Sequence, residues 1–188
     1  MFNYFAKEKS DFLNKKDKSK KCHIDKDIIK IVNEINSKRD YYTTSSCSGR
    51  IVLLEKLSKK KNESRWLFVK HNKIKSNEIL KILKNKIKNE IWFKQEPLIL
   101  HVRCRNSDDA IKLLNISRKI FKRAGIISLS IRKIVVEIIG NERIDTIVAD
   151  KDFVGDEKYL KQLIKYANSN FMENKRKSEG FFDIIKNL

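Results

Sequence analysis

The run YYTTSSCSGR at residues 41–50 is the stretch around which the rest of the chain is organised. Its short hydroxyl side chains each bring a donor and acceptors to positions where a core strand would carry apolar groups. Gly49 permits a turn or the close approach of a ligand, and Arg50 ends the run with a planar cation suited to carboxylate or phosphate. The run predicts either a polar cradle for an anionic ligand or nucleotide, or a strand and turn without a ligand.

The segments around this run alternate between helical and extended patterns. Apolar residues spaced from Ile24 to Ile35 form one stripe of a helix that precedes the run. Ser76, as an N-cap, Ser107 and Asp156 mark the starts of three further helices. Gly125 is expected to cap the C-terminus of the helix that starts at Ser107, and the inward residues of the last helix reach Phe171, with a basic tail beyond. A strand is expected in the polar run, and further strands at residues 51–54, 66–69, 91–93, 98–104, 126–131, 133–139 and 143–148.

These elements predict an α+β protein, with a mixed or antiparallel sheet packed with helices. The order strand, helix, strand occurs at 66–93 and again from 98 onward, which is a weak hint of internal duplication. No glycine-rich fingerprint follows any strand, so neither a Rossmann dinucleotide site nor a P-loop is indicated. The length of 188 residues is enough for one or two small domains with a real core.

The charge of the chain indicates a polyanionic partner. Forty-three Lys and Arg residues against 24 Asp and Glu residues leave a formal net charge of +19. Such a basic surface favours nucleic acid. An AT-rich genome would also produce a chain rich in Lys, Ile and Asn whatever its function, so the charge alone leaves both explanations open.

Cysteine usage and hydropathy exclude several classes of protein. The three cysteines are scattered, and there is no C-x-x-C pair or zinc-type spacing of Cys and His. The N-terminus has no apolar signal core, and no stretch approaches the roughly 18 apolar residues of a membrane span. We therefore expect a soluble, cytoplasmic protein without a metal or a membrane partner. The pattern leaves the oligomeric state undefined.

A set of motifs runs in order along nearly the whole chain. It comprises Asp17-Lys18-Ser19, Ile24-Asp25, YYTTSSCSGR at 41–50, Trp66, His71, EPLILHVRC at 96–104, Ala110, Gly125, KIVVEI at 133–138 and Ala167-Asn168. This set resembles the tRNA wybutosine-synthesizing protein 3 family, and the combination of TSSCSGR with EPxxLHVxC is specific. Cys22-His23 and Leu129-Ser130-Ile131 depart from the family pattern, which usually has Gly and Ser-Gly-Ile there, as in a divergent, archaeal-like member.

The resemblance implies a tRNA methyltransferase that uses S-adenosylmethionine, formed by a single domain over residues 1–188 and not built on the Rossmann-like fold. The implied reaction methylates the N-4 ring nitrogen of the 4-demethylwyosine-type guanosine next to the anticodon of tRNA(Phe). The implied partner is the anticodon stem-loop of that tRNA. The alternative is a non-catalytic tRNA-binding protein or a scaffold of the wyosine pathway.

Site candidates follow from these motifs. His71, His101 and Glu96 are the catalytic candidates, because a histidine accepts a proton near neutral pH and Glu96 could act as a base or bind ribose hydroxyls. A structural histidine at 101 and a turn charge at 96 are equally compatible with the sequence. The candidate contacts to the methyl donor are Ser45, Ser46, Ser48, Arg50 and Asp17, and Arg50 could instead contact a tRNA phosphate.

The candidate RNA contacts lie in a basic loop and on the strand that follows it. Lysines and arginines in such a loop bind phosphates without reading bases, and a tryptophan can stack on a base or anchor a core. The residues are Lys59, Lys60, Lys61, Arg65 and Trp66.

Overall fold

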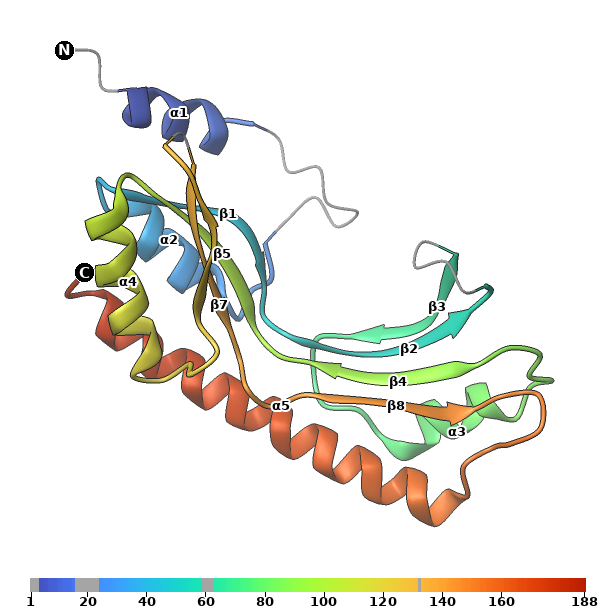
Figure 1. The fold of residues 1–188 in the computed structure, drawn as a ribbon. Coiled ribbons are helices and arrows are strands. Elements are labelled where there is room, and N and C mark those ends of the chain that lie inside the picture. Colours follow the sequence, from blue (N-terminus) through green and yellow to red (C-terminus); the bar gives the residue numbers. More distant parts are fainter. Residues whose placement is uncertain (1–3, 16–23, 59–62, 132) are drawn as a thin grey trace. The chain divides into compact units, whose positions relative to one another are not determined.

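The computed structural model describes residues 4–15, 24–58, 63–131 and 133–188 (Figure 1). Asp17 and the three lysines at 59–61 therefore lie outside the described residues. The chain divides into two compact units, one comprising Met1–Ser48, Leu98–Asn141 and Lys175–Leu188, the other Gly49–Pro97 and Glu142–Asn174. We call them unit 1 and unit 2. No helix in the described part of the chain is long and apolar enough to cross a membrane.

Unit 1 is a four-stranded antiparallel sheet with helices. The strand order is β1-β5-β7-β6, and β1, β5 and β7 lie side by side in Figure 1. The strands are β1 (Tyr41–Cys47), β5 (Ile99–Cys104), β7 (Ile134–Ile139) and β6 (Gly125–Leu129). The helices are α1 (Tyr4–Leu13), α2 (Ile29–Ser37), α4 (Ser107–Arg118) and the C-terminal part of α5 (Glu157–Ile185).

Unit 2 is built in the same way, with the strand order β3-β2-β4-β8 and all pairs antiparallel. Its strands are β3 (Ser64–Lys70), β2 (Arg50–Lys56), β4 (Ile91–Glu96) and β8 (Ile144–Ala149). Helix α3 (Ser76–Leu83) and the N-terminal part of α5 belong to it. In unit 1 the segment β5–α4–β6 joins two strands that have β7 between them in the sheet. In unit 2 the segment β3–α3–β4 joins two strands that have β2 between them.

Each unit has its own apolar core. In unit 1, Ile31 and Ile35 of α2 and Leu113 of α4 pack with fully buried residues of the sheet, among them Leu100. In unit 2, Phe93 of the sheet packs with residues of α3 and α5. Burial of a large apolar side chain contributes about 1.5–3 kcal/mol to the free energy of folding. The buried residues of these two cores therefore hold the helices against one face of each sheet.

The predicted α+β class and the predicted strands are confirmed, and the sheets are antiparallel. Two helix starts are shifted. Helix α2 begins at Ile29, so Ile24 of the predicted stripe lies outside it, and the start of α3 differs by one residue. Ser76 is the first residue of α3 and Lys75 is its N-cap, because the Glu78 carboxylate accepts a hydrogen bond of 2.7 Å from the Lys75 backbone N–H. The acid in the first turn thus satisfies the backbone N–H of the residue that precedes the helix.

Two helix ends were predicted wrongly. Helix α4 ends at Arg118 and Gly125 begins β6, because Phe121 and Ala124 form a turn in which the Phe121 N–H donates to the Ser117 carbonyl at 2.8 Å. The basic segment after Phe171 is a continuation of α5 and not a tail. It is helical because apolar residues recur in it and enter the core of unit 1.

Candidate active site

Three polar side chains meet on one face of the sheet in unit 1. The register places Ser45 of β1 opposite His101 of β5, and His101 opposite Glu137 of β7. Directly paired residues in antiparallel strands share a face and lie within contact distance. The Ser45 Oγ lies 2.9 Å from the His101 Nδ1, and the His101 Nε2 lies 2.9 Å from a Glu137 carboxylate oxygen. The three groups form one hydrogen-bonded chain.

The chemistry of the carboxylate sets the direction of these hydrogen bonds. An ionised carboxylate only accepts, so the Nε2 of His101 carries the hydrogen that points to Glu137. The Nδ1 of the neutral ring is then an acceptor, and the Ser45 hydroxyl donates to it. The histidine is thus held as the tautomer that can take a proton from Ser45, with a negative charge behind it.

This chain of groups is accessible. The side chains of His101 and Glu137 are 29% and 28% exposed, and Ser45 is exposed. The residue opposite Glu137 on β6 is Gly125, and a Cβ added there would meet nothing within 4 Å. A ligand can therefore approach this face of the sheet without displacing a packed side chain at that position.

The sequence identified Ser45 and His101 but missed Glu137. The signal was present, because Glu137 is the only charge in the apolar strand IVVEII. A charged residue in such a strand needs a polar partner on a neighbouring strand. The local pattern does not show which strand lies next to β7. The partner of Glu137 can therefore be identified only from the order of the strands in the sheet.

Helix α1 covers the adjoining end of the same face. The Glu8 carboxylate accepts from the Tyr42 hydroxyl at 2.9 Å and from the Arg103 guanidinium at 3.2 Å. The rings of Phe5 and Phe12 lie 5.6 and 5.2 Å from the Tyr42 ring, measured between centroids. Burial, followed by the hydrogen bond to Glu8, raises the pKa of Tyr42 above its usual range, so the phenol stays protonated.

The hydroxyl run does not line a single face. Ser46 is paired with the buried Leu100, so it projects to the side of β1 opposite to Ser45. The backbone N–H and hydroxyl of Ser48 donate to Asp25 at 3.0 and 3.1 Å, which holds the end of the strand. Gly49 follows with a φ of 96°, a conformation that side chains rarely adopt, so the predicted turn is confirmed.

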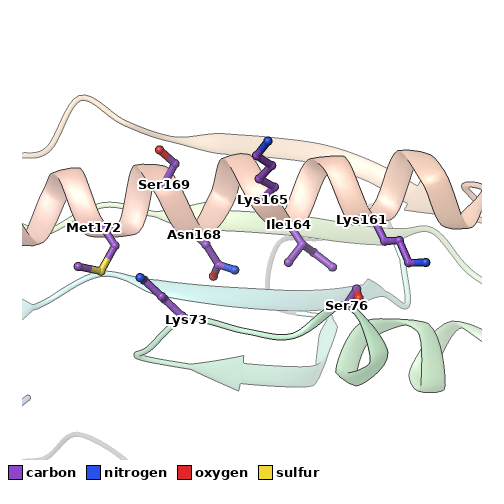
Figure 2. A pocket seen from close by; sticks show the side chains of 8 residues that line it. All are labelled: Lys73, Ser76, Lys161, Ile164, Lys165, Asn168, Ser169 and Met172. Atoms are coloured by element: carbon purple, nitrogen blue, oxygen red, sulfur yellow. The ribbon is translucent and has the colours of Figure 1, made fainter.

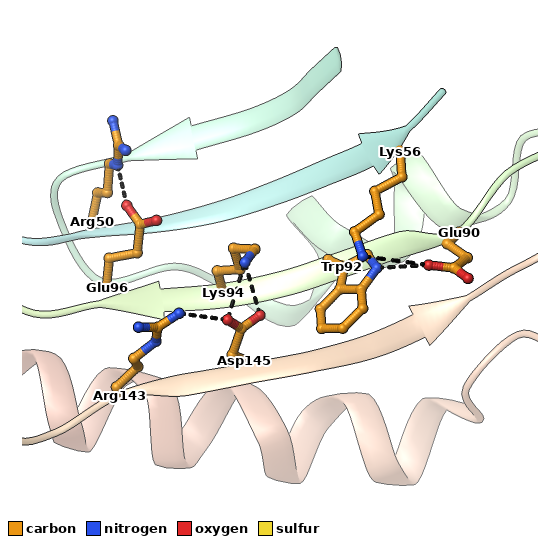
Figure 3. Close-up of polar contacts among 8 residues, drawn as sticks. All are labelled: Arg50, Lys56, Glu90, Trp92, Lys94, Glu96, Arg143 and Asp145. Carbon is orange, nitrogen blue, oxygen red and sulfur yellow. Dashed lines mark hydrogen bonds and ion pairs between the residues drawn. The ribbon is translucent and has the colours of Figure 1, made fainter. Parts of the chain in front are cut away.

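Three other predicted site residues meet in unit 2. The Arg50 Nε donates to the Glu96 carboxylate at 2.5 Å (Figure 3), and the guanidinium lies 4.4 Å from the centroid of the Trp66 ring. Arg65 pairs instead with Glu55, at 2.6 Å. His71 directly follows β3 and is half-buried. Of the described candidates, Ser45, Ser46, Ser48 and His101 belong to unit 1, and Arg50, Arg65, Trp66, His71 and Glu96 belong to unit 2.

Unit 2 also has an open hollow of about 590 Å³ beside α5 (Figure 2). Asn168 ties α5 to the segment before α3, because its side chain accepts from the Ile74 N–H and donates to the Ile74 carbonyl, both at 2.9 Å. Lys161 at its edge pairs with Glu157 at 2.6 Å. The lining residues are Lys73, Ser76, Lys161, Ile164, Lys165, Asn168, Ser169 and Met172.

Comparison with known proteins identifies the class to which this protein belongs. Residues 7–187 match the model of the family described as Methyltransferase TYW3. The α+β fold without a nucleotide-binding glycine loop is thus that of a methyltransferase outside the Rossmann-like class, as the sequence motifs predicted.

Individual relatives agree with this class. The chain is 35% identical over 168 residues to a Pyrococcus abyssi protein named tRNA(Phe) 7-((3-amino-3-carboxypropyl)-4-demethylwyosine(37)-N(4))-methyltransferase 1, covering 88% of this chain and 87% of the relative. It is 32% identical over 188 residues to the tRNA wybutosine-synthesizing protein 3 homolog of Danio rerio, covering 97% and 74%. The solved structure of the PH1069 protein from Pyrococcus horikoshii superimposes with a TM-score of 0.86 at 33% identity, covering 96% and 95%. The chain belongs to the TYW3 methyltransferase family.

Proposed function

We propose that this protein methylates the N-4 ring nitrogen of the 4-demethylwyosine-type guanosine next to the anticodon of tRNA(Phe), with S-adenosylmethionine as the methyl donor. The observation that carries the proposal is membership of a methyltransferase family whose archaeal relatives are named for this reaction, such as the protein of Methanocaldococcus jannaschii at 38% identity. The net charge of +19 suits a tRNA substrate. The cytoplasmic location and the single functional domain remain predictions.

The residues that could hold the donor offer the chemistry that its groups need. Its carboxylate needs cationic donors, and its ribose and ammonium groups need hydroxyl or carboxylate partners. In unit 1, the hydroxyls of Ser45, Ser46 and Ser48 each carry one donor and two acceptor lone pairs. In unit 2, the Arg50 guanidinium has five donors, of which Nε is engaged by Glu96. We retain these four residues as candidates, and Asp17 as a prediction.

The donor, when bound, supplies a methyl group that is already activated on sulfonium. The protein must then align the ring nitrogen and remove the proton that this nitrogen loses as the N–C bond forms and the C–S bond breaks. We assign proton removal to Ser45, His101 and Glu137. The Ser45 hydroxyl accepts the proton while its own passes to the Nδ1 of His101, and the Glu137 carboxylate stabilises the resulting imidazolium.

Glu96 and His71 were the other catalytic candidates. Glu96 is engaged by Arg50, so we propose that it orients the guanidinium and does not accept the proton. His71 follows β3 in unit 2 and remains a catalytic candidate. Arg65, Trp66 and the three lysines at 59–61 remain predicted RNA contacts.

The test is transfer of labelled methyl groups from S-adenosylmethionine to tRNA(Phe) that carries the demethylated precursor. Label should appear in the modified base, and the same tRNA without the precursor should remain unlabelled. Absence of transfer, together with absence of donor binding by calorimetry, would overturn the proposal. A non-catalytic RNA-binding protein would bind the tRNA while its melting temperature stayed unchanged at saturating donor, because only a ligand of the native state raises that temperature.

A further inference from the structure

Both tryptophans of the chain lie on the same face of the sheet in unit 2. Leu54 of β2 is paired with Trp66 of β3 on one side and with Trp92 of β4 on the other. Cross-strand partners share a face, so the two tryptophans lie on either side of Leu54, with their backbone positions two strand spacings, about 9.6 Å, apart. The opposite face of this sheet carries Phe93 and packs against α3 and α5.

Each ring is accompanied by a cation. The Arg50 guanidinium lies 4.4 Å from the Trp66 centroid, and the Lys56 ammonium lies 3.8 Å from the Trp92 centroid, with Lys94 at 5.4 Å. These pairs come from side chains on the same face, because Arg50, Leu54 and Lys56 are separated by even numbers of residues along one strand. The arrangement thus occurs twice, each time as an aromatic ring with a positive charge over it.

Acidic neighbours hold these groups in place (Figure 3). The Trp92 Nε1 donates to the Glu90 carboxylate at 3.0 Å, and Lys56 lies 3.7 Å from the same carboxylate. Glu96 holds Arg50, and Asp145 accepts from Lys94 at 3.0 Å. The Trp92 ring and the three cations are therefore oriented before any ligand arrives, which lowers the entropy lost on binding.

The face is partly exposed, with Trp92 half-buried, and its chemistry favours one kind of partner. Trp66 is 52% exposed, and Ile147 of β8 on the same face is 37% exposed. Trp66, Leu54, Trp92 and Ile147 form one apolar row across the sheet. Each ring of this row is paired with a cation, which an apolar protein-docking surface does not need and a polyanionic partner does. Aromatic platforms next to cations on an open antiparallel sheet are what proteins use to bind unpaired nucleotides.

We infer that this face of unit 2 binds unpaired bases of the RNA substrate, with stacking on Trp66 and Trp92 and phosphate contacts from the neighbouring cations. The inference rests on the proposed function, since it supplies the surface that a tRNA loop would occupy. It adds Trp92 and Lys56 to the predicted RNA contacts. Trp66 acts here as a stacking platform, one of the two roles that its sequence position left open.

The tryptophan emission of the protein reports on this face alone, because the chain has no other tryptophan. Titration with an anticodon stem-loop RNA should quench it, and Trp66→Phe and Trp92→Phe should each leave one reporting ring that is still quenched. Removal of a stacked base contact weakens binding by roughly 5- to 150-fold. We expect Trp66→Ala and Trp92→Ala each to raise the Kd within this range, and Tyr166→Ala, which removes an aromatic ring that is 58% exposed on α5, to leave it unchanged.

Two comparisons make the outcome decisive. A fully paired RNA duplex of equal length should leave the emission unchanged, because its bases are stacked on one another. RNA binding without quenching, equal quenching by the duplex, or an equal loss in Tyr166→Ala would overturn the inference. Saturation of the emission change by S-adenosylmethionine alone would overturn it as well, since the rings would then hold the donor.

Failure of the inference is distinguishable from failure of the proposed function. If the wild-type protein transfers methyl groups but RNA leaves both tryptophans unquenched, the function stands and the inference fails. If RNA quenches both rings in a protein that neither binds the donor nor transfers methyl groups, the proposed function fails and the stacking surface stands. Circular dichroism of each variant verifies that the sheet is folded.

Discussion

Replacement of Glu137 by glutamine tests the proton path most directly. The substitution keeps the shape of the side chain and removes the negative charge that stabilises a protonated His101. A glutamine amide can also donate to the Nε2 of His101, which would move the ring hydrogen to Nδ1 and prevent that nitrogen from accepting the Ser45 proton. We expect the methyl-transfer rate to fall while donor binding is retained.

The magnitude follows from the geometry. A hydrogen bond to a charged group contributes about 1.5–3 kcal/mol. The bond from His101 to Glu137 is 2.9 Å long but both side chains are more than a quarter exposed, so the lower end of that range applies. About 1.4 kcal/mol corresponds to a tenfold change, and we expect kcat to fall by about tenfold. His101→Gln removes the proton acceptor itself and should cost about 10²- to 10⁴-fold.

The assay is single-turnover methyl transfer with tRNA and donor both saturating, so that changes in binding do not enter the rate. Nitrogen NMR of the imidazole ring gives a second readout, since it reports which ring nitrogen carries hydrogen in each variant. Glu34→Gln is the matched control, because Glu34 lies on α2 and pairs with Lys38. Rates within twofold of wild type for both Glu137→Gln and His101→Gln would refute the reasoning.

Three further predictions concern stability. Phe181→Ala empties a fully buried position in the core of unit 1 and should lower the free energy of unfolding by about 3–5 kcal/mol, measured with denaturant. The hydrogen bond from Asn89, aided by an ion pair and opposed by burial, lowers the pKa of Glu55. The stabilisation from Glu55 is therefore present above the pKa of an unfolded glutamate and lost as pH falls through the lower folded value; Glu55→Gln should flatten this part of the acid unfolding curve. Glu8→Gln weakens the bonds to Arg103, so hydrogen exchange in α1 should accelerate, in line with a loss of about 1–2 kcal/mol.

Matched measurements separate these effects from general damage. Phe153→Ala removes a ring that is 49% exposed and should change stability by about 0.5 kcal/mol or less. An unchanged acid unfolding curve in Glu55→Gln would contradict the assigned cause of the pKa shift. Equal acceleration of exchange throughout the sheet in Glu8→Gln would show that the carboxylate stabilises the whole unit and not the docking of α1.

Local pattern predicted the elements well where side-chain periodicity and backbone chemistry act over a few residues. The C-terminal part of the apolar stripe before the polar run lies in α2, and the turn at Gly49 has the positive φ that glycine accepts. The errors lie at helix ends. Ser76 is the first residue of α3 and Lys75 is its N-cap, and α5 continues because distant residues of unit 1 bury its last apolar side chains.

The same distinction between local pattern and tertiary structure applies to the candidate site. The sequence by itself determined that short hydroxyls precede Arg50, that His101 lies in an apolar strand and that the motifs belong to one family. Only the tertiary structure decided that Ser45, His101 and Glu137 are cross-strand neighbours, and that Ser46 points to the other side of β1. Such contacts join residues 56 and 36 positions apart. They depend on which strands pair and in which register, and that is set by burial of the whole sheet face and not by any local propensity.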